Sequence, residues 1–542
     1  MTAHATELQR LANWIAAVSY EDLPQRVLQR ARWQLMSVVA AVHAGAGTEA
    51  GAAVRAAVAR RPRSGPCTVL PHNEKRPLED ALLQSSAYSM VLDYDDYLLM
   101  GHTGHSAVLG AWALCEAEDL TTRELILSQV IANEIEGRLG ASCVLGPQNG
   151  QAWSFIHAAG GAALASRLLG LSRGQTAHAL AVALYQPPYT LWPGFMGPTS
   201  KALTAALPTI AGIRAAQLAR EGLTGALDII EHPRHGFWQH FAFVPLPGML
   251  AGLGRVWVTD TIAVKQYPGC AYLDTTLDAL LEVLRRYREA AGRSLRPDEV
   301  GQVEVEAGLL TVGMDNLSAE AARHGELAPV AINFSIPLSA AIAILAGRLT
   351  AAELSADFLE QNANAIRSLA SRITLAHAWP MTFDTVQCFD AAFGGRSPLP
   401  GLGPLDALRL ALGLAPHLGG ARRNDPRFGA LLLEHPGRLL KLAQRLVRRG
   451  PAATLADADL ARFRMVFPAR VTLELASGQR LSAQQDVPFG APGQARMAET
   501  VERKVRWELK GTEVDRALEL MGKLEEVRLD ELTRAVCKRQ RV

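Results

Sequence analysis

The sequence predicts a mainly α protein made of a large all-α helical domain and a smaller α+β domain. From Glu7 to about Leu250, apolar residues recur at spacings of three and four, as they do on the buried face of a helix. Beyond residue 255, Val303, Val305 and Ala307 alternate with polar residues, which is typical of a half-buried strand. With 542 residues, the chain is long enough for about three structural units.

Residues 1–257 are expected to form the helical domain. Two helix starts carry capping boxes, Thr121-x-x-Glu124 and Ser172-x-x-Gln175, in which side chains satisfy free N–H groups of the first turn. Several helices in this region are rich in Ala and Gly, and small residues let helix backbones approach closely. We therefore expect a compact helical bundle.

Residues 258–376 and 464–490 are expected to form the α+β domain from two separate chain segments. The period-2 pattern recurs in the second segment, where Ser477-Gly478 predicts a hairpin turn between two strands. Helices are predicted between the strands of the first segment. The further strands are expected at Arg372–Leu375, Val471–Leu475 and Arg480–Ala483, and the helices at Ser335–Leu349 and Leu354–Leu369.

Residues 377–463, between the two segments, are interpreted as a helical insertion. A linker rich in Gly and Pro at 394–404 precedes amphipathic patterns at Leu405–Leu414 and Arg427–Arg449. The tail after Gln494 is helical in pattern and strongly charged, which is typical of a solvated surface helix.

Composition narrows the classes of function. The 55 Lys and Arg residues nearly balance the 53 Asp and Glu residues, so we expect neither nucleic acid nor a membrane as a partner. The six Cys are scattered, and Glu7 and Arg10 interrupt any apolar export signal, so a cytoplasmic location is expected. Only eight of the 55 basic residues are Lys, which makes each Lys informative.

The densest polar cluster in the helical half runs from Asp93 to Tyr97 and is followed by His102 and His105. If the segment were a helix, Asp93 and Asp96 would lie on one face and Asp95 would not. Three readings remain open. The acids and imidazoles could bind a metal, they could form an acid/base site, or they could be surface charges at a helix end.

Two further segments place Lys in positions suited to anions. Gly197 to Lys201 opens a helix predicted at Ala202–Leu218, where hydroxyls, free N–H groups and an ammonium would meet. Val264 to Cys270 contains Lys265 and lies at the transition between the two predicted domains, where ligand sites are common.

Five segments, taken in order, resemble the MmgE/PrpD family, whose members include dehydratases, decarboxylases and epimerases of small polycarboxylic acids. The resemblance covers roughly residues 8–376 and 464–495. The segments are LANWIAAVSYEDLP, LDYDDYLLMGHTGHSAV, Ser200-Lys201 with AAQLAREGLTGALDIIE, VKQYPGC and INFSIPLSAAIA.

The resemblance implies an MmgE/PrpD-like fold, in which residues 258–376 and 464–490 form a lid and C-terminal helices at 491–542 return to the helical domain. It also implies a homodimer that uses no metal and no organic cofactor. The implied catalytic residues are His102, Lys201, Asp93 and His105, with His102 preferred over His105 as proton carrier. Substrate contacts are expected from Lys265, Gln151, Ser200, Tyr97 and Cys270.

Departures from the family pattern predict an altered pocket. Gln151 and Cys270 stand where family decarboxylases have His, Asp274 stands where dehydratases often have His, and Leu338 replaces a Tyr. The sequence therefore predicts a cofactor-independent lyase or isomerase that moves a proton next to a carboxylate of a small acidic substrate.

Two other classes of protein compete with that prediction. One is a non-catalytic binding or assembly protein on the same fold. The other is a metal-dependent hydrolase that would use Asp93, Asp96, His102 and His105.

Overall fold

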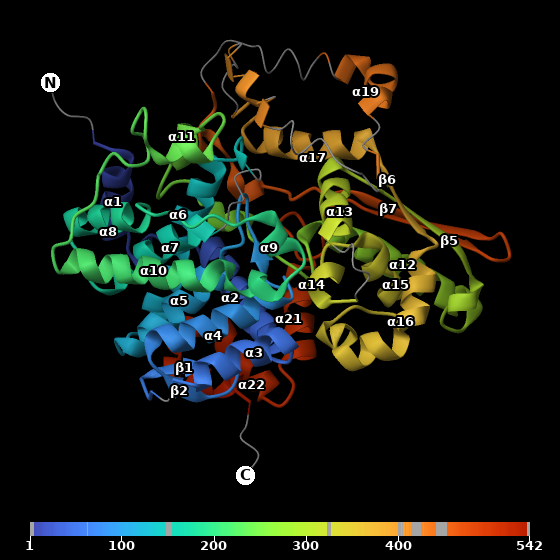
Figure 1. Ribbon diagram of the computed structural model, residues 1–542, viewed down its shortest axis with the longest axis horizontal. Helices are drawn as coiled ribbons and strands as arrows, with labels where there is room; N and C mark the ends of the chain where they lie inside the picture. Colours follow the sequence, from blue (N-terminus) through green and yellow to red (C-terminus); the bar gives the residue numbers. More distant parts are fainter. Residues whose placement is uncertain are drawn as a thin grey trace.

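The computed structural model describes residues 5–61, 63–147, 154–321, 327–398 and 452–538, together with short stretches between 403 and 440. It is mainly helical and has two lobes, a larger helical lobe at the left of Figure 1 and a smaller lobe with a sheet at the right. The predicted fold class is confirmed.

The helical lobe is a bundle in which both predicted capping boxes are present. Its α7 and α10 lie in close contact because of glycines. A Cβ on Gly212 would stand 2.1 Å from the Ala158 carbonyl oxygen, and one on Gly161 would stand 2.5 Å from that of Thr209. The helices are α1 (Glu7–Ala17), α2 (Gln25–Ala46), α3 (Glu49–Ala59), α4 (Leu78–Val91), α5 (Gly104–Ala117), α6 (Thr122–Ser142), α7 (Ser154–Leu168), α8 (Arg173–Ala183), α9 (Trp192–Met196), α10 (Leu203–Arg220) and α11 (Phe237–Phe241).

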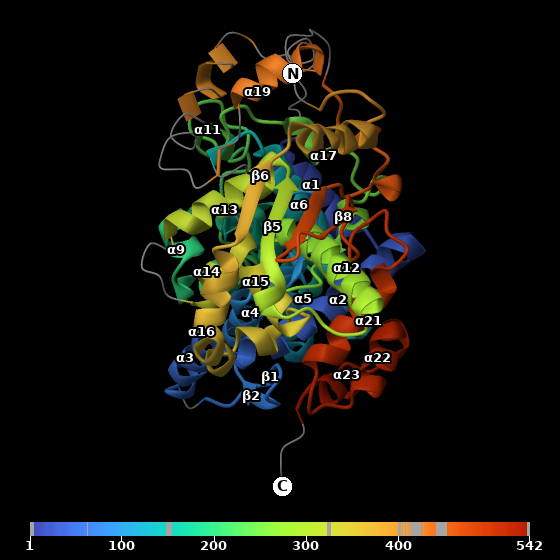
Figure 2. The same cartoon turned by 90° about the vertical axis from the view of Figure 1, so that its right-hand side faces the viewer.

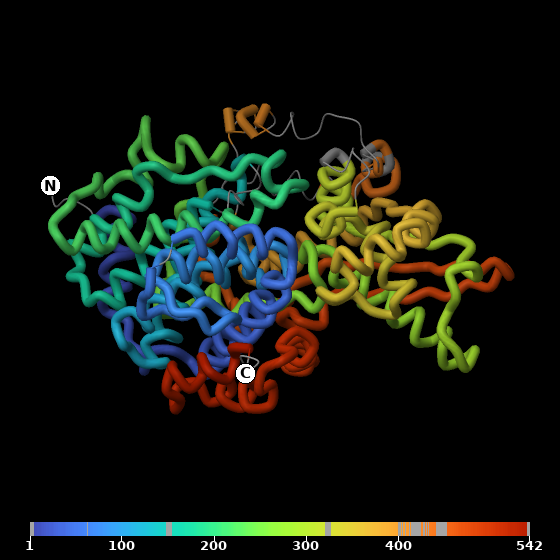
Figure 3. The backbone as a smooth tube through the Cα atoms, turned by 60° about the horizontal axis from the view of Figure 1, so that its bottom comes forward, coloured from blue at the N-terminus to red at the C-terminus, as the bar shows by residue number. Residues whose placement is uncertain are grey.

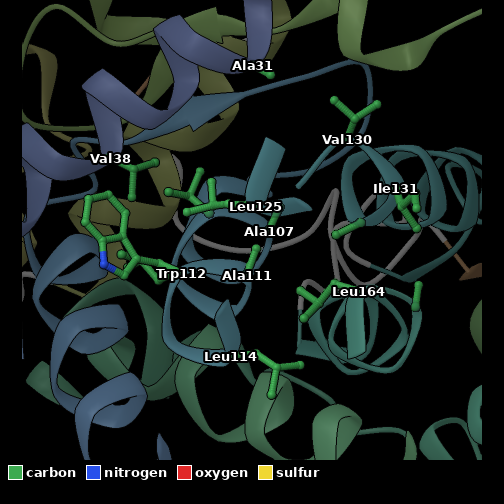
Figure 4. Close-up of a cluster of buried hydrophobic side chains, with 14 of the residues drawn as sticks. Ala31, Val38, Ala107, Ala111, Trp112, Leu114, Leu125, Val130, Ile131 and Leu164 are labelled. Carbon is green, nitrogen blue, oxygen red and sulfur yellow. The ribbon is translucent and has the colours of Figure 1, made fainter. Parts of the chain in front are cut away.

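The core of this lobe lies where α2, α5, α6 and α7 meet. Figure 4 shows Trp112 of α5 beside Val38 of α2, with Leu125 and Ile131 from α6 and Leu164 from α7 around them. These side chains are fully or almost fully buried, which fixes the helices that carry the candidate site.

The smaller lobe holds a four-stranded sheet built from both predicted chain segments. Its order is β6 (Ile373–His377), β5 (Val300–Ala307), β7 (Ala469–Leu475) and β8 (Arg480–Gln485), and only the β5–β6 pair is parallel. The predicted strands and the hairpin at Ser477-Gly478 are confirmed within two residues at their ends.

Helices accompany this sheet in the smaller lobe (Figure 2). The predicted helix at Ser335–Leu349 is shorter, because Ser335 caps it and Gly347 ends it in a left-handed conformation. The helices are α12 (Asp274–Ala291), α13 (Leu309–Ala321), α14 (Pro329–Ile332), α15 (Ile336–Ala346) and α16 (Ala356–Ala370), with a 3-10 turn, η8 (Ala351–Leu354), before the last.

The expectation that all secondary structure from Glu7 to about Leu250 is helical is wrong at two places. A hairpin of β1 (Cys67–Val69) and β2 (Glu74–Arg76) stands between α3 and α4, where Pro71 and Pro77 lack the N–H that a helix needs. Further on, β3 (Asp96–Tyr97) pairs antiparallel with β4 (Ala263–Val264). The second pair links the end of the helical lobe to the segment that carries Lys265.

The insertion contains α17 (Trp379–Ala392) and α19 (Phe428–Glu434). The described residues of the helix predicted at Leu405–Leu414 are helical, and α19 covers part of the helix predicted at Arg427–Arg449, whose last part lies outside the described residues.

The C-terminal tail packs against the helical lobe. It forms α21 (Met497–Glu508), α22 (Val514–Gly522) and α23 (Leu529–Val536), and Figure 3 shows this last part of the chain beside the first. α21 contacts α2 and buries Met497, Val501 and Val505. The interpretation as a solvated surface helix is therefore wrong for this face of α21.

One helical stretch among the described residues, Thr199–Arg220, is long and apolar enough to cross a membrane by length and composition. It is 61% buried inside the protein over its most apolar window, and an interior helix of a globular fold meets the same criteria. In this structure α10 packs against α4, α7 and α8.

Candidate active site

The candidate site forms where α4 ends. Asp93 follows α4 with a φ of 51°, a left-handed conformation that Asp tolerates better than most residues, and the chain then turns into β3. The backbone N–H of Lys265, directly after β4, donates to the Asp95 carbonyl at 3.1 Å. The strand pair thus brings two segments about 170 residues apart in sequence into contact.

Asp93 and Asp95 share the ammonium group of Lys265. Its Nζ lies 3.1 Å from Asp93 Oδ1 and 2.9 Å from Asp95 Oδ1, and it also donates to the Asp93 carbonyl at 2.8 Å. All three side chains are buried. Burial alone would lower the pKa of Lys265, but Asp93 and Asp95 raise it well above its ordinary value. Lys265 is thus a permanent cation that donates hydrogen bonds to the Asp93 carbonyl and Asp95 Oδ1 and forms an ion pair with Asp93 Oδ1.

Lys201 reaches the same acids from the other side. Its Nζ lies 3.4 Å from Asp93 Oδ2, and it stands 4.2 Å from the ring centre of Phe334 and 4.6 Å from that of Phe195. Among the described residues, the ammonium has no hydrogen-bond partner of normal geometry. Burial lowers its pKa to about 8, although Asp93 opposes the shift. Lys201 therefore has bonding capacity that Lys265 lacks.

Asp95 also holds both predicted histidines. Its Oδ2 lies 3.3 Å from His102 Nδ1 and 2.9 Å from His105 Nε2. Burial alone would raise the pKa of Asp95, but His105 and Lys265 keep it well below its ordinary value. Burial, with the nearby Lys265, lowers the pKa of His102. Asp95 is thus the centre of the cluster, although the sequence did not single it out.

The two imidazoles differ in their contacts. His105 Nδ1 lies 2.7 Å from Ser89 Oγ, and its Nε2 lies 2.9 Å from Asp95 Oδ2 without forming a hydrogen bond of normal geometry to a described residue. His102 contacts Asp95 through Nδ1. If that nitrogen carries the proton, Nε2 of His102 is the basic atom.

The expectation that Asp93 and Asp96 share a face is wrong. The segment is a turn followed by a short strand, in which alternate side chains point to opposite sides, so Asp93 pairs with Asp95 instead. Asp96 accepts a hydrogen bond from Gln34 Nε2 at 2.7 Å. A Cβ on Gly104 would stand 2.0 Å from its other oxygen, which explains the glycine there. Burial, with the nearby Asp95, raises the pKa of Asp96 to about 7.

The remaining predicted residues lie at different distances from this centre. Tyr97 is buried with its ring centre 6.2 Å from that of His102. Cys270 is buried, and burial together with the charge of Asp93 raises its pKa to about 12. Ser200 is exposed and donates to the Gly194 carbonyl at 2.6 Å, so its hydroxyl lies outside the cluster. Gln151 lies outside the described residues.

Besides Asp95, the sequence interpretation missed Lys504. It reaches the cluster from α21, is fully buried, and donates to Ser37 Oγ at 2.8 Å and to the Tyr94 carbonyl. Three of the eight lysines, Lys201, Lys265 and Lys504, thus meet around one segment. A sequence signal exists, because Lys504 stands at a helical spacing from Val501 and Met497 where an apolar residue is expected.

Behind the histidines lies a second buried group. His157 Nδ1 stands 2.7 Å from Ser106 Oγ and 3.1 Å from Glu136 Oε2, and burial raises the pKa of Glu136 well above its ordinary value. The ring of His157 lies 6.3 Å from that of His105. This arrangement supports the position of His105.

The acid cluster fits an ion-paired centre better than a metal centre. Asp93, Asp95 and His102 offer ligand atoms within 4.8 Å of one another, as a metal ion would need. However, the ammonium of Lys265 already stands between the two carboxylates, and its raised pKa opposes loss of the proton. A divalent ion would therefore meet a fixed positive charge at the same place.

Comparison with known proteins shows what the chain is similar to. Residues 9–244 match the sequence profile of the MmgE/PrpD N-terminal domain. The cis-aconitate decarboxylase of Aspergillus terreus (strain NIH 2624 / FGSC A1156) is 25% identical over 304 residues, which are 52% of this chain and 61% of that protein. The cis-aconitate decarboxylase-like protein oryM of Aspergillus oryzae (strain ATCC 42149 / RIB 40) is 24% identical over 301 residues, 51% of this chain and 61% of that protein.

The chain thus spans about three fifths of the length of the relatives it matches. A mainly α fold with a smaller α+β lobe, and a buried centre of acids, lysines and imidazoles, accompany the profile match. Residues 9–244 therefore resemble the MmgE/PrpD N-terminal domain, and the chain is similar to decarboxylases at about 25% identity.

Proposed function

We propose that this protein is a lyase or isomerase that moves a proton next to a carboxylate of a small di- or tricarboxylic acid, without a metal or organic cofactor. The relatives named cis-aconitate decarboxylase support a lyase that acts on such an acid. The observation that carries the proposal is the convergence of Lys201, Asp93 and the Asp95–His102 pair in one buried centre.

The reaction needs a base and a cation near the same carbon. His102 would accept the proton, because its lowered pKa keeps the imidazole neutral near pH 7 and Asp95 orients it through Nδ1. Lys201 would bind the substrate carboxylate and stabilise the negative charge that develops on it. His105, which Ser89 holds through Nδ1 and whose Nε2 lies 2.9 Å from Asp95 Oδ2, would help to keep Asp95 in place.

Lys265 would act on the protein rather than on the substrate. Its two hydrogen bonds and its ion pairs are all with Asp93 and Asp95, so it keeps these acids ionised and in place. This role differs from the substrate contact that the sequence suggested. The charges of Lys201, Lys265, Asp93 and Asp95 cancel, so attraction for an acidic substrate would come from the position of Lys201.

A cavity between the two lobes supports a route to this centre. It has a volume of about 680 Å³ and is lined by the ends of α2 and α3 on one side and by α14, η8 and α16 on the other. Val91 and Thr199 form part of its wall, each two residues before a member of the cluster. Closure of the two lobes there would exclude water from the reaction.

The test is incubation of the purified chain with cis-aconitate, hydroxytricarboxylates and four-carbon dicarboxylates in deuterated water. Mass spectrometry separates loss of carbon dioxide, loss of water and deuterium uptake without other change. We expect one of these with the wild type and none with Lys201→Ala or His102→Gln. Ser200→Ala is the matched control. Absence of all three with every acid would refute the proposal, as would activity that chelation removes and a metal restores.

A further inference from the structure

Lys504 is a buried cation that the proposed chemistry does not use. It stands on the buried face of α21, which lies between α2 and the smaller lobe in Figure 1. None of the ion pairs among the described residues includes Lys504. A buried ammonium without a paired carboxylate is costly, so its contacts call for an explanation.

Its contacts are with the backbone of the site segment. The ammonium donates to the Tyr94 carbonyl, lies 3.4 Å from the Asp95 carbonyl and stands 4.0 Å from the ring centre of Tyr94. Ser37 accepts from Lys504 at 2.8 Å and itself donates to the Asp95 carbonyl at 3.1 Å. Lys504 and Ser37 thus hold consecutive carbonyls in the turn that carries Asp93 and Asp95.

The neighbouring residue of α21 holds the other strand segment. Arg503 Nη2 donates to Gln266 Oε1 at 2.5 Å, next to Lys265 in the sequence. One turn of α21 therefore contacts the chain beside both the acids and the lysine of the candidate site. These two contacts connect the C-terminal tail directly to the geometry of the site.

We propose that Lys504 is a positioning residue, whose ammonium fixes the Tyr94 and Asp95 carbonyls and so keeps the Asp93 and Asp95 carboxylates in place against their cationic partners. Removal of such a group would loosen a turn that already includes a left-handed Asp93. The role needs no particular substrate. Its consequence for turnover, however, rests on the proposed function.

The protonation of Lys504 gives the role a pH dependence. Burial lowers the pKa of Lys504 to about 7, although Asp95 opposes the shift. The other ionisable groups that act on it are Lys265, Glu508 and Asp274, from the strand segment, α21 itself and α12. An ammonium has three N–H donors and an amine has two, so the carbonyls are held best below pH 7.

The test is hydrogen exchange, measured by mass spectrometry on the whole chain without substrate. Lys504→Met should speed exchange in peptides that cover residues 93–97 by about 10-fold or more, because a hydrogen bond from a charged group is lost. Lys510→Met, which removes an exposed lysine next to the same helix, should leave that exchange unchanged. Equal exchange in Lys504→Met and the wild type would refute the proposal.

The pH dependence of exchange distinguishes loss of the Lys504 charge from loss of side-chain packing, because packing alone does not change with pH. After correction for intrinsic exchange, protection of residues 93–97 should fall in the wild type as pH rises from 6 to 8, and it should be flat in Lys504→Met. A wild type without this dependence counts against the proposal. If Lys504→Met does not fold, Ser37→Ala keeps the ammonium and should give a smaller increase over the same residues, and no increase there would refute it.

Turnover then separates this proposal from the proposed function. With an active substrate, Lys504→Met should lower kcat by about 10-fold or more and change KM by less than about 3-fold, since the turn carries Asp95, which orients His102, rather than the carboxylate-binding Lys201. If no substrate is ever turned over, the proposed function fails while the exchange result still decides the role of Lys504.

Discussion

Removal of Lys265 should expose how much the site depends on one buried cation. Lys265→Met keeps most of the side-chain length and deletes the charge between Asp93 and Asp95. Two buried carboxylates then lose their shared partner, and the Asp93 carbonyl loses a donor at 2.8 Å. Breaking a buried ion pair by removing one partner costs about 3–5 kcal/mol, so we expect a loss of about 4 kcal/mol in the free energy of unfolding at pH 8.

The loss should shrink in acid. In the wild type, the pKa values of Asp93 and Asp95 are lowered, so the stability that they contribute is present above their ordinary pKa and is lost as pH falls through the lowered one. In the variant, burial without Lys265 raises these pKa values instead. For each unit by which the pKa of one of these carboxyls then exceeds 5, the variant regains about 1.4 kcal/mol of stability at pH 5.

Urea unfolding followed by tryptophan fluorescence at pH 8 and pH 5 measures both effects. Lys75→Met is the matched control, because the Lys75 side chain is half exposed and the carboxylate of its ion-pair partner, Glu116, lies 3.6 Å away. Adding Asp95→Asn to Lys265→Met should recover part of the loss, since one uncompensated charge is removed. A loss below about 1 kcal/mol at pH 8, or one that is equal at both pH values, would refute the reasoning about the shared cation.

Four other outcomes are expected. Asp96→Asn should gain stability relative to the wild type by up to about 3 kcal/mol between pH 5 and pH 8, because the folded wild type keeps the Asp96 proton up to a pKa of about 7 whereas the unfolded chain has already lost it; equal pH profiles would contradict this. Lys201→Ala should lower kcat/KM at least about 100-fold, whereas Ser200→Ala should change it less than about 3-fold, as steady-state kinetics would show. His102→Gln should abolish deuterium exchange at the substrate carbon while circular dichroism stays unchanged, and retained exchange would move the base elsewhere. Exhaustive chelation should leave turnover intact, and its loss and metal-dependent recovery would support a metal centre instead.

Local patterns in the sequence were enough for most of the fold. The capping boxes at Thr121 and Ser172, the period-2 strands of the smaller lobe and its hairpin at Ser477-Gly478 are all present. Each of these depends on side chains within a few residues of one another, so the sequence contains the whole cause. The helical pattern was less useful at 67–76, where short strands interrupt it.

The candidate site was only partly predictable. Asp93, His102, Lys201 and Lys265 were expected through family resemblance, and the structure brings all four together. The central role of Asp95 was missed, because a helix would place Asp93 beside Asp96, whereas the turn and short strand place Asp93 beside Asp95.

The sequence by itself therefore determined the elements, the lobes' secondary structure and a short list of informative lysines. Only the tertiary structure decided which of these lysines act together. Lys201, Lys265 and Lys504 come from three distant segments, and they meet because the 3-10 turn before α10, the residues after β4, and α21 pack around the turn after α4. Contacts of this kind depend on how buried faces fit in space, and no local periodicity records that fit.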